Sequence, residues 1–252
     1  MAYTTIDKPT DYFNTKLYTG NGTSQSITGV GFRPDWVWKK ERDSTSGHQL
    51  TDAVRGTGKI LRSDNTDAEL VNAEKLTSFD SDGFSLGNNV AVNQSSISYV
   101  SWNWLSANGT SSNTDGTITS TVSANTTAGF SIVSWTGNGS DATIGHGLSQ
   151  APEMYVVKNR DDTADWRVGQ TVSGNTMTGG NGYYMEWNDN KASTNPGSAV
   201  TWGSTPTAPT NQVQQDNHIR YTIIKEIHLT KVIKFYLLIF LMLNKMMQVQ
   251  QP

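Results

Sequence analysis

The sequence contains no cysteine, and its charge is low and nearly balanced. Without cysteine there is no disulfide framework and no thiolate site. Charged residues make up 16% of the 252 residues, and the formal net charge is −3. A chain of this charge offers no strongly basic surface to attract nucleic acid or an anionic membrane. These absences exclude disulfide-rich scaffolds, and we expect no nucleic-acid partner.

Familiar catalytic motifs are missing as well. No two of the four histidines have metal-ligand spacing such as His-Glu-x-x-His, and a lone histidine is more often structural. The segment Gly56–Lys59 is too short for a phosphate-binding loop, and there is no Gly-x-Ser-x-Gly nucleophile elbow. We therefore assign no catalytic residue and no cofactor, and we expect that the protein is not an enzyme.

Calcium is the one metal that the sequence leaves open. Acidic clusters at Asp64–Asp67, Asp80–Asp82 and Asp161–Asp162 could each supply oxygen ligands. Aspartate is also common in ordinary turns, because its side chain accepts hydrogen bonds from nearby backbone N–H groups. The turn interpretation is favoured, and no metal ligand is assigned.

The two ends of the chain are unusual in opposite ways. Residues Met1–Pro9 lack the apolar core of a signal peptide, so we expect synthesis in a cytoplasm. Near the other end, Phe235–Leu243 is an apolar run of nine residues, too short to span a bilayer. It lacks the alternation of a sandwich strand, so we expect residues 225–252 to join no sandwich core. We interpret this segment as an abnormal end, with an interfacial anchor as the alternative.

What the sequence does have is a repeat of short β-forming runs between Gly- and Asn-rich turns. The stretch Tyr18–Arg42 returns as Trp135–Arg160. This pattern predicts an all-β protein of two tandem β-sandwiches. The predicted division is a lead-in at 1–10, a sandwich at 11–106, a polar linker at 107–116, a second sandwich of uncertain completeness at 117–224, and the atypical tail at 225–252.

Aligning the two copies indicates which strand face is buried. The segment around Trp36 and Trp38 aligns without a gap with that around Met154 and Val156, so this face stays apolar while residue type changes. We expect a core face here rather than an exposed platform for sugar. The predicted first core holds four tryptophans: Trp36, Trp38, Trp102 and Trp104. The closing strand of the second copy is predicted at His218–Ile223, with Ile219, Tyr221 and Ile223 opposite Val100, Trp102 and Trp104.

Aromatic residues are abundant for so polar a chain, with eight tryptophans and nine tyrosines. Exposed rings beside Asn and Asp suit carbohydrate, which is bound by stacking and by hydrogen bonds to hydroxyls. The second copy supplies the candidate glycan-binding residues, each of which has a place in the core as its alternative: Tyr155, Trp166, Tyr183, Tyr184 and Trp187.

Several segments together resemble a tandem domain of bacteriophage tail-fibre and virion structural proteins. They are Tyr18–Gly22, Gly31–Arg42, Arg55–Gly56, Leu76–Phe84 and Tyr99–Trp104, and the resemblance covers roughly residues 11 to 224. It implies lectin-like β-sandwiches of the jelly-roll or concanavalin-like kind on a virion appendage. The partners it implies are other virion proteins, further copies in a homotrimer, and host-surface carbohydrate. It supplies no catalytic residues.

Two other functions remain open at this point. One is a carbohydrate-active enzyme, either a glycosidase or a lyase, on a concanavalin-like sandwich. A glycosidase would need two carboxylates flanking a sugar, and the sequence singles out no such pair. The other is a prophage-encoded adhesin on the bacterial surface, which the sequence does not separate from a tail fibre.

Overall fold

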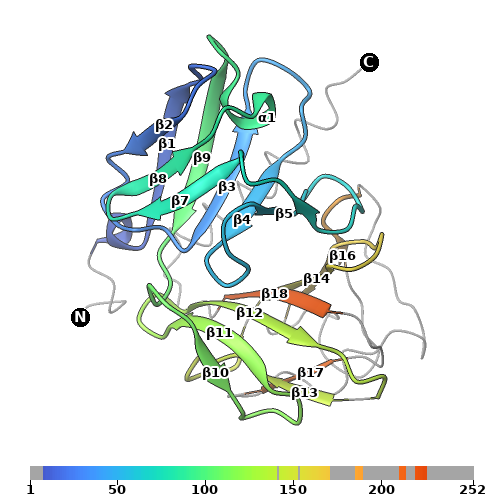
Figure 1. Ribbon diagram of the computed structural model, residues 1–252. Coiled ribbons are helices and arrows are strands. Elements are labelled where there is room, and N and C mark those ends of the chain that lie inside the picture. Colours follow the sequence, from blue (N-terminus) through green and yellow to red (C-terminus); the bar gives the residue numbers. More distant parts are fainter. Residues whose placement is uncertain are drawn as a thin grey trace.

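The computed structural model describes residues 8–140, 142–152, 154–170, 185–189, 210–213 and 219–225. This part contains strands β1 to β18, the one-turn helix α1 (Val90–Asn93) and a 3-10 turn (Pro9–Asp11), so the predicted all-β sandwich class is confirmed. Below, the first half means residues up to 106 and the second half the residues after it. Figure 1 shows the first half above the second.

The first half is built from two antiparallel sheets. Its four-stranded sheet has the order β1 (Phe13–Thr19), β9 (Ser98–Trp104), β3 (Trp36–Glu41), β4 (Gln49–Asp52). Its three-stranded sheet has the order β2 (Gln25–Thr28), β8 (Gly83–Leu86), β7 (Leu76–Asp80), and β5 (Lys59–Ile60) pairs with β6 (Leu70–Val71). Buried apolar side chains form the interior of this half: Ile27, Val37, Leu76, Phe84, Leu86 and Val92.

The second half repeats this plan with a wider sheet. Its seven strands have the order β10 (Ser111–Asn113), β11 (Ser120–Asn125), β12 (Phe130–Thr136), β18 (Ile219–Lys225), β14 (Met154–Asn159), β15 (Arg167–Gln170), β16 (Met185–Glu186). A second layer pairs β13 (Ala142–Gly145) with β17 (Thr210–Val213). The buried residues of its interior are Val122, Val133, Trp135, Ile144, Leu148 and Tyr155. The segment 107–116, predicted as a linker, contains β10 and so contributes to this sheet.

The strand pairing of the two halves matches residue by residue. Aligned residues have aligned cross-strand partners in β3–β4 and β14–β15: Trp36–Asp52 with Met154–Gln170, and Trp38–Leu50 with Val156–Val168. The closing strand is in a different register from the one we predicted. Lys40 lies opposite Val100 and Lys158 lies opposite Tyr221, so Tyr221, not Ile219, is the counterpart of Val100. A shift of two residues preserves the period of a strand, which is why alternation alone did not reveal it.

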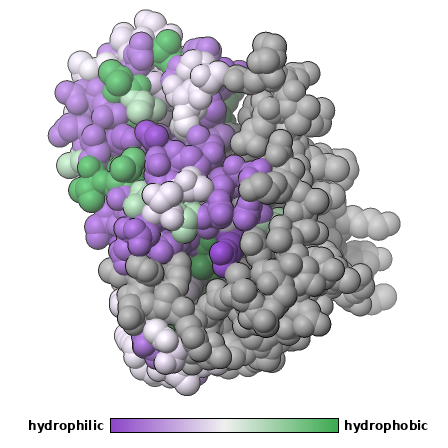
Figure 2. All heavy atoms as spheres, turned by 90° about the vertical axis from the view of Figure 1, so that its right-hand side faces the viewer, coloured by the Kyte–Doolittle hydropathy of each residue, from purple (hydrophilic) through white to green (hydrophobic). Residues whose placement is uncertain are grey.

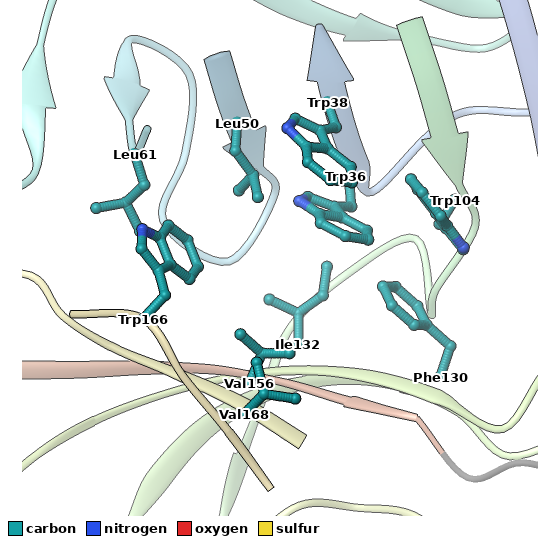
Figure 3. Close-up of a cluster of buried hydrophobic side chains, with 10 residues drawn as sticks. All are labelled: Trp36, Trp38, Leu50, Leu61, Trp104, Phe130, Ile132, Val156, Trp166 and Val168. Carbon is teal, nitrogen blue, oxygen red and sulfur yellow. The ribbon is translucent and has the colours of Figure 1, made fainter. Parts of the chain in front are cut away.

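The largest hydrophobic cluster lies between the halves, not inside either one. The four-stranded and seven-stranded sheets face each other across it, and we call this cluster the seam (Figure 3). Its buried members are Trp36, Trp38, Leu50, Leu61 and Trp104 from the first half and Phe130, Ile132, Val156, Trp166 and Val168 from the second. The ring centroids of Trp36 and Phe130 lie 5.7 Å apart, and those of Trp36 and Trp104 lie 4.2 Å apart.

The seam corrects our assignment of the four tryptophans. Trp36, Trp38 and Trp104 are buried, and Trp102 is partly buried against them, but this face of the sheet packs on the other half. The interior of the first half receives the alternate residues of β3, including Val37. Each half presents the same face to the other, as two subunits do across a twofold axis. The division into separate domains remains a prediction, since this core is shared.

The surface of the described residues is mainly polar. In the view of Figure 2, hydrophilic residues dominate the first half and hydrophobic residues lie in small separate groups. Among the described residues, no helix is long and apolar enough to cross a membrane. The predicted tail at 225–252 lies outside the described residues except for Lys225, the last residue of β18.

Candidate functional site

Tyr155, a predicted glycan-binding residue, is buried in the interior of the second half. Only 2% of its surface is exposed, and its ring packs among the residues of that core. It lies opposite Gly169 in the β14–β15 pair, and a side chain at residue 169 would overlap the Tyr155 ring. Burial raises the pKa of the Tyr155 hydroxyl well above its usual value. This ring has no free face on which a sugar could stack, so the prediction is wrong for Tyr155.

Trp166 is also buried, at the seam. Its exposed fraction is 0%, and its indole Nε1 donates a hydrogen bond to the backbone oxygen of Arg62 in the other half, at 2.7 Å. Trp166 aligns with His48, so the second half places a large ring where the first half has a smaller one. A tryptophan with its N–H satisfied and its ring enclosed is a core residue. The glycan-binding prediction is therefore wrong for Trp166 too.

Trp187 is the one described candidate that is only partly buried. It is half-buried and meets Trp38 and Trp166 edge to face, with ring centroids 5.0 Å and 5.6 Å apart. Its backbone N–H donates to the oxygen of Trp166 at 2.9 Å. Tyr183 and Tyr184 lie outside the described residues. The structure thus brings Trp166 and Trp187 together at the seam and places Tyr155 elsewhere.

A charged cluster at the seam was missed in the sequence. Glu69 accepts hydrogen bonds from Arg55 Nη1 at 2.9 Å, from Arg160 Nε at 2.9 Å and from Arg160 Nη2 at 2.8 Å. The backbone N–H of Glu69 also donates to the oxygen of Arg160, at 2.8 Å. Arg55 in addition pairs with Asp52, and both side chains are fully buried. One carboxylate therefore joins an arginine of each half.

Burial and hydrogen bonding act on the Glu69 carboxyl in opposite directions. Burial raises its pKa, but the hydrogen bonds and charges of Arg160 and Arg55 outweigh this and leave the pKa below its ordinary value. Glu69 is thus held as an anion between two cations. This is a structural arrangement, because all three groups are already occupied with one another.

Two of the three acidic clusters considered for calcium, at Asp64–Asp67 and Asp80–Asp82, are engaged in local structure. Asp82 accepts hydrogen bonds from the N–H groups of Gly29 and Gly31, which lower the pKa of its carboxyl. Asp80 accepts from two serine hydroxyls, and Asp67 from the side chain of Asn65. Across the described ranges, no group of three His, Cys, Asp or Glu side chains is placed to hold a metal ion.

Comparison with known families decides the affiliation of the chain. Residues 8–227 match the model of a family described as a domain of unknown function, DUF7483. The chain belongs to this family. No curated protein and no solved structure matches it. The DUF7483 match runs across both halves and the seam between them, so one family unit corresponds to the whole shared core.

Within this DUF7483 unit the two halves repeat their polar contacts as well as their strands. Lys40 Nζ donates to the backbone oxygen of Ser44, and Lys158 Nζ donates to that of Asp162, the aligned residue. Lys158 also reaches the oxygen of Thr66 in the first half, at 3.2 Å. The aligned lysines thus stabilise a loop in each half, and one of them contributes to the contact between halves.

A second repeated contact leads to a stability prediction. Asp64 Oδ1 accepts from the N–H of His48 at 2.8 Å, and Asn188 Oδ1 accepts from the N–H of Trp166 at 2.7 Å. We expect Asp64→Ala and Asn188→Ala each to lower the free energy of unfolding by about 1–2 kcal/mol, measured by urea denaturation. Asp64→Ala should lower the free energy of unfolding more than Asn188→Ala does, because the acceptor that it removes is an ionised carboxylate. Asn138→Ala, in an exposed turn, is the control, and equal effects of all three would contradict the prediction.

Proposed function

We propose that this protein is a structural module of a phage particle, in a tail fibre or similar appendage. The observation that carries the proposal is the position of the segments that resemble such proteins. Gly31–Arg42 holds the seam tryptophans of β3, Leu76–Phe84 forms the β7–β8 hairpin, and Tyr99–Trp104 lies in β9. These motifs build the framework of the fold, so the resemblance is one of scaffold.

The chemistry of the framework supports a static role over a catalytic one. Sheets of both halves are packed face to face over aromatic rings, and Glu69 is held between arginines of the two halves. Carboxylates that an enzyme could use, such as Asp35 and Asp82, accept hydrogen bonds from two backbone N–H groups each. A rigid β-structure of this kind suits a part that carries load or presents a surface.

Carbohydrate on the host surface is the proposed ligand of the appendage. With Tyr155 and Trp166 buried, Trp187 is the described residue that supports stacking on a sugar ring. Its position at the rim of the seam holds the ring against Trp38 and Trp166. The side chains that would donate to sugar hydroxyls are not assigned.

The role in a particle is tested by proteomics of purified virions. Density-purified particles from an induced or infected culture should contain the protein at a constant ratio to the major capsid protein. Detection only in the bacterial envelope would favour a surface adhesin, and detection only in the soluble fraction would contradict a structural role. Glycan binding is tested separately on an array, where Trp187→Ala should lose signal that an exposed control, Val90→Ala, retains.

A further inference from the structure

The edge of the four-stranded sheet differs between the halves in a way that points to a partner. In the second half, β12 pairs with β18 on one side and with β11 on the other. Its counterpart in the first half is β1, which among the described strands pairs only with β9 and so forms the edge of its sheet (Figure 1, left-hand side). The same position in the repeat is therefore covered by a strand in one half and uncovered in the other.

The backbone groups on this open edge follow from the pairing with β9. The backbone oxygen of Tyr12 accepts from the N–H of Leu105, and the backbone of Gly20 bonds to that of Ser96 and Ile97. The backbone groups of Tyr12 and Gly20 therefore point toward β9 and its flanking residues. Residues alternate in direction along a strand, so Thr15, Leu17 and Thr19 point their N–H and C=O groups away from β9. Seven residues long, β1 is a ready template for another strand.

Two of these outward groups are already bound by side chains. The N–H of Thr15 donates to Asn14 Oδ1 at 2.9 Å, and the oxygen of Thr19 accepts from Gln25 Nε2 at 3.2 Å. Among the described residues, nothing bonds to the N–H or C=O of Leu17, the oxygen of Thr15 or the N–H of Thr19. The Leu17 side chain is 62% exposed.

This arrangement is self-complementary about Leu17. If two β1 strands pair antiparallel with Leu17 opposite Leu17, each Leu17 N–H meets the other Leu17 oxygen, and each Thr19 N–H meets a Thr15 oxygen. The Thr15–Thr19 pair would have a second bond, from the Thr15 N–H to the Thr19 oxygen of the other copy. These two groups are the ones already bound by the side chains of Asn14 and Gln25. Lys16 would lie opposite Tyr18, so no like charges face each other. The two exposed leucines would cover one another.

We propose that β1 is a self-association edge, and that two copies of this chain pair through it into one continuous eight-stranded sheet. A twofold contact closes on itself and ends the assembly at two chains. This differs from the threefold assembly expected from tail-fibre resemblance. It does not depend on the proposed function, because it follows from the strand edge alone.

The test is the mass of the full chain in solution with the variant Leu17→Pro. Proline removes the outward N–H of residue 17 and leaves the bonds to β9, which use its neighbours, so an edge strand tolerates it. We expect a dimer for the natural chain by light scattering. Leu17→Pro should weaken dimerisation at least tenfold, and Val90→Thr, which removes a similarly exposed side chain at 64%, should leave it unchanged. A monomer or a trimer at every concentration would overturn the proposal.

A cross-link provides a second measurement if Leu17→Pro fails to fold. The chain has no cysteine, so a single introduced thiol reports only its own contacts. Leu17→Cys should form a disulfide-linked dimer under mild oxidation, because residue 17 lies opposite its own copy. Val90→Cys should not. Equal cross-linking of both variants, or of neither, would contradict pairing through β1.

Discussion

Glu69→Ala is expected to lower the free energy of unfolding by roughly 3–5 kcal/mol, the usual cost of leaving a buried charge without its partner. The side chain of Arg55 is fully buried and that of Arg160 is 12% exposed, so neither guanidinium can recover its hydration when the carboxylate is removed. Among the described residues, the Arg55 side chain would keep its ion pair with Asp52, whereas the Arg160 guanidinium would keep only its hydrogen bond to the Ser134 hydroxyl. Most of the loss should therefore come from Arg160, on the second half.

The measurement is chemical denaturation near pH 7, with the exposed Glu74→Ala as control. The pKa of Glu69 is lower in the folded protein, so its contribution is fully present above the pKa of an unfolded glutamate and is lost as pH falls through the folded pKa. The difference between the natural chain and Glu69→Gln should accordingly shrink in acid. A loss as small as that of Glu74→Ala would show that the cluster does not hold the halves together.

Most of the fold that could be predicted from the sequence was predicted from the repeat. An ungapped alignment of short strands predicts equal register, and β3–β4 and β14–β15 have it. The direction of burial was harder. Strand β3 is buried on both faces, so alternation separates Trp36 and Trp38 from Val37 and Lys39 but does not tell which set faces the interior of its own half. Trp36 and Trp38 face the other half, and no local sequence pattern reveals this.

The candidate site was less predictable, for a related reason. Tyr155 and Trp166 are residue types that commonly stack on sugars, and their burial depends on other parts of the fold. Gly169 leaves room for the Tyr155 ring, and the Trp166 indole reaches the backbone of Arg62. Glu69 likewise meets Arg160 across the seam. Nothing in the sequence marks Glu69 as the partner of Arg160.

Strand β3 carries a buried lysine, Lys39. Lys39 is 1% exposed and points into the interior of the first half, with Nζ 5.9 Å from the centre of the Phe84 ring. No hydrogen-bond partner for this Nζ is present among the described residues. Burial, together with the charges of Lys75 and Arg55, lowers the pKa of Lys39 to about 7. The aligned residue of the second half is Val157, an apolar side chain in the same strand position.

We expect Lys39→Met to stabilise the protein at pH 7 by about 1–4 kcal/mol, since it removes a buried charge and keeps the volume. The lowered pKa of Lys39 sets the direction in which stability changes with pH. Below pH 7 the amine is charged in both states, and the folded state carries the whole penalty. Between about 7 and the unfolded value of 10.5 the unfolded chain binds more protons, so the stability of the natural chain rises with pH.

The advantage of Lys39→Met should therefore be largest at pH 7 and below, and nearly gone by pH 10.5. Thermal melting of both proteins across this range measures it, with the exposed Lys8→Met as the matched loss of one charge. If Lys39→Met is less stable than the natural chain at pH 7, the buried ammonium does not destabilise the fold and the prediction is wrong. An advantage that stays constant up to pH 10.5 would show that the charge of Lys39 is not the source of the cost.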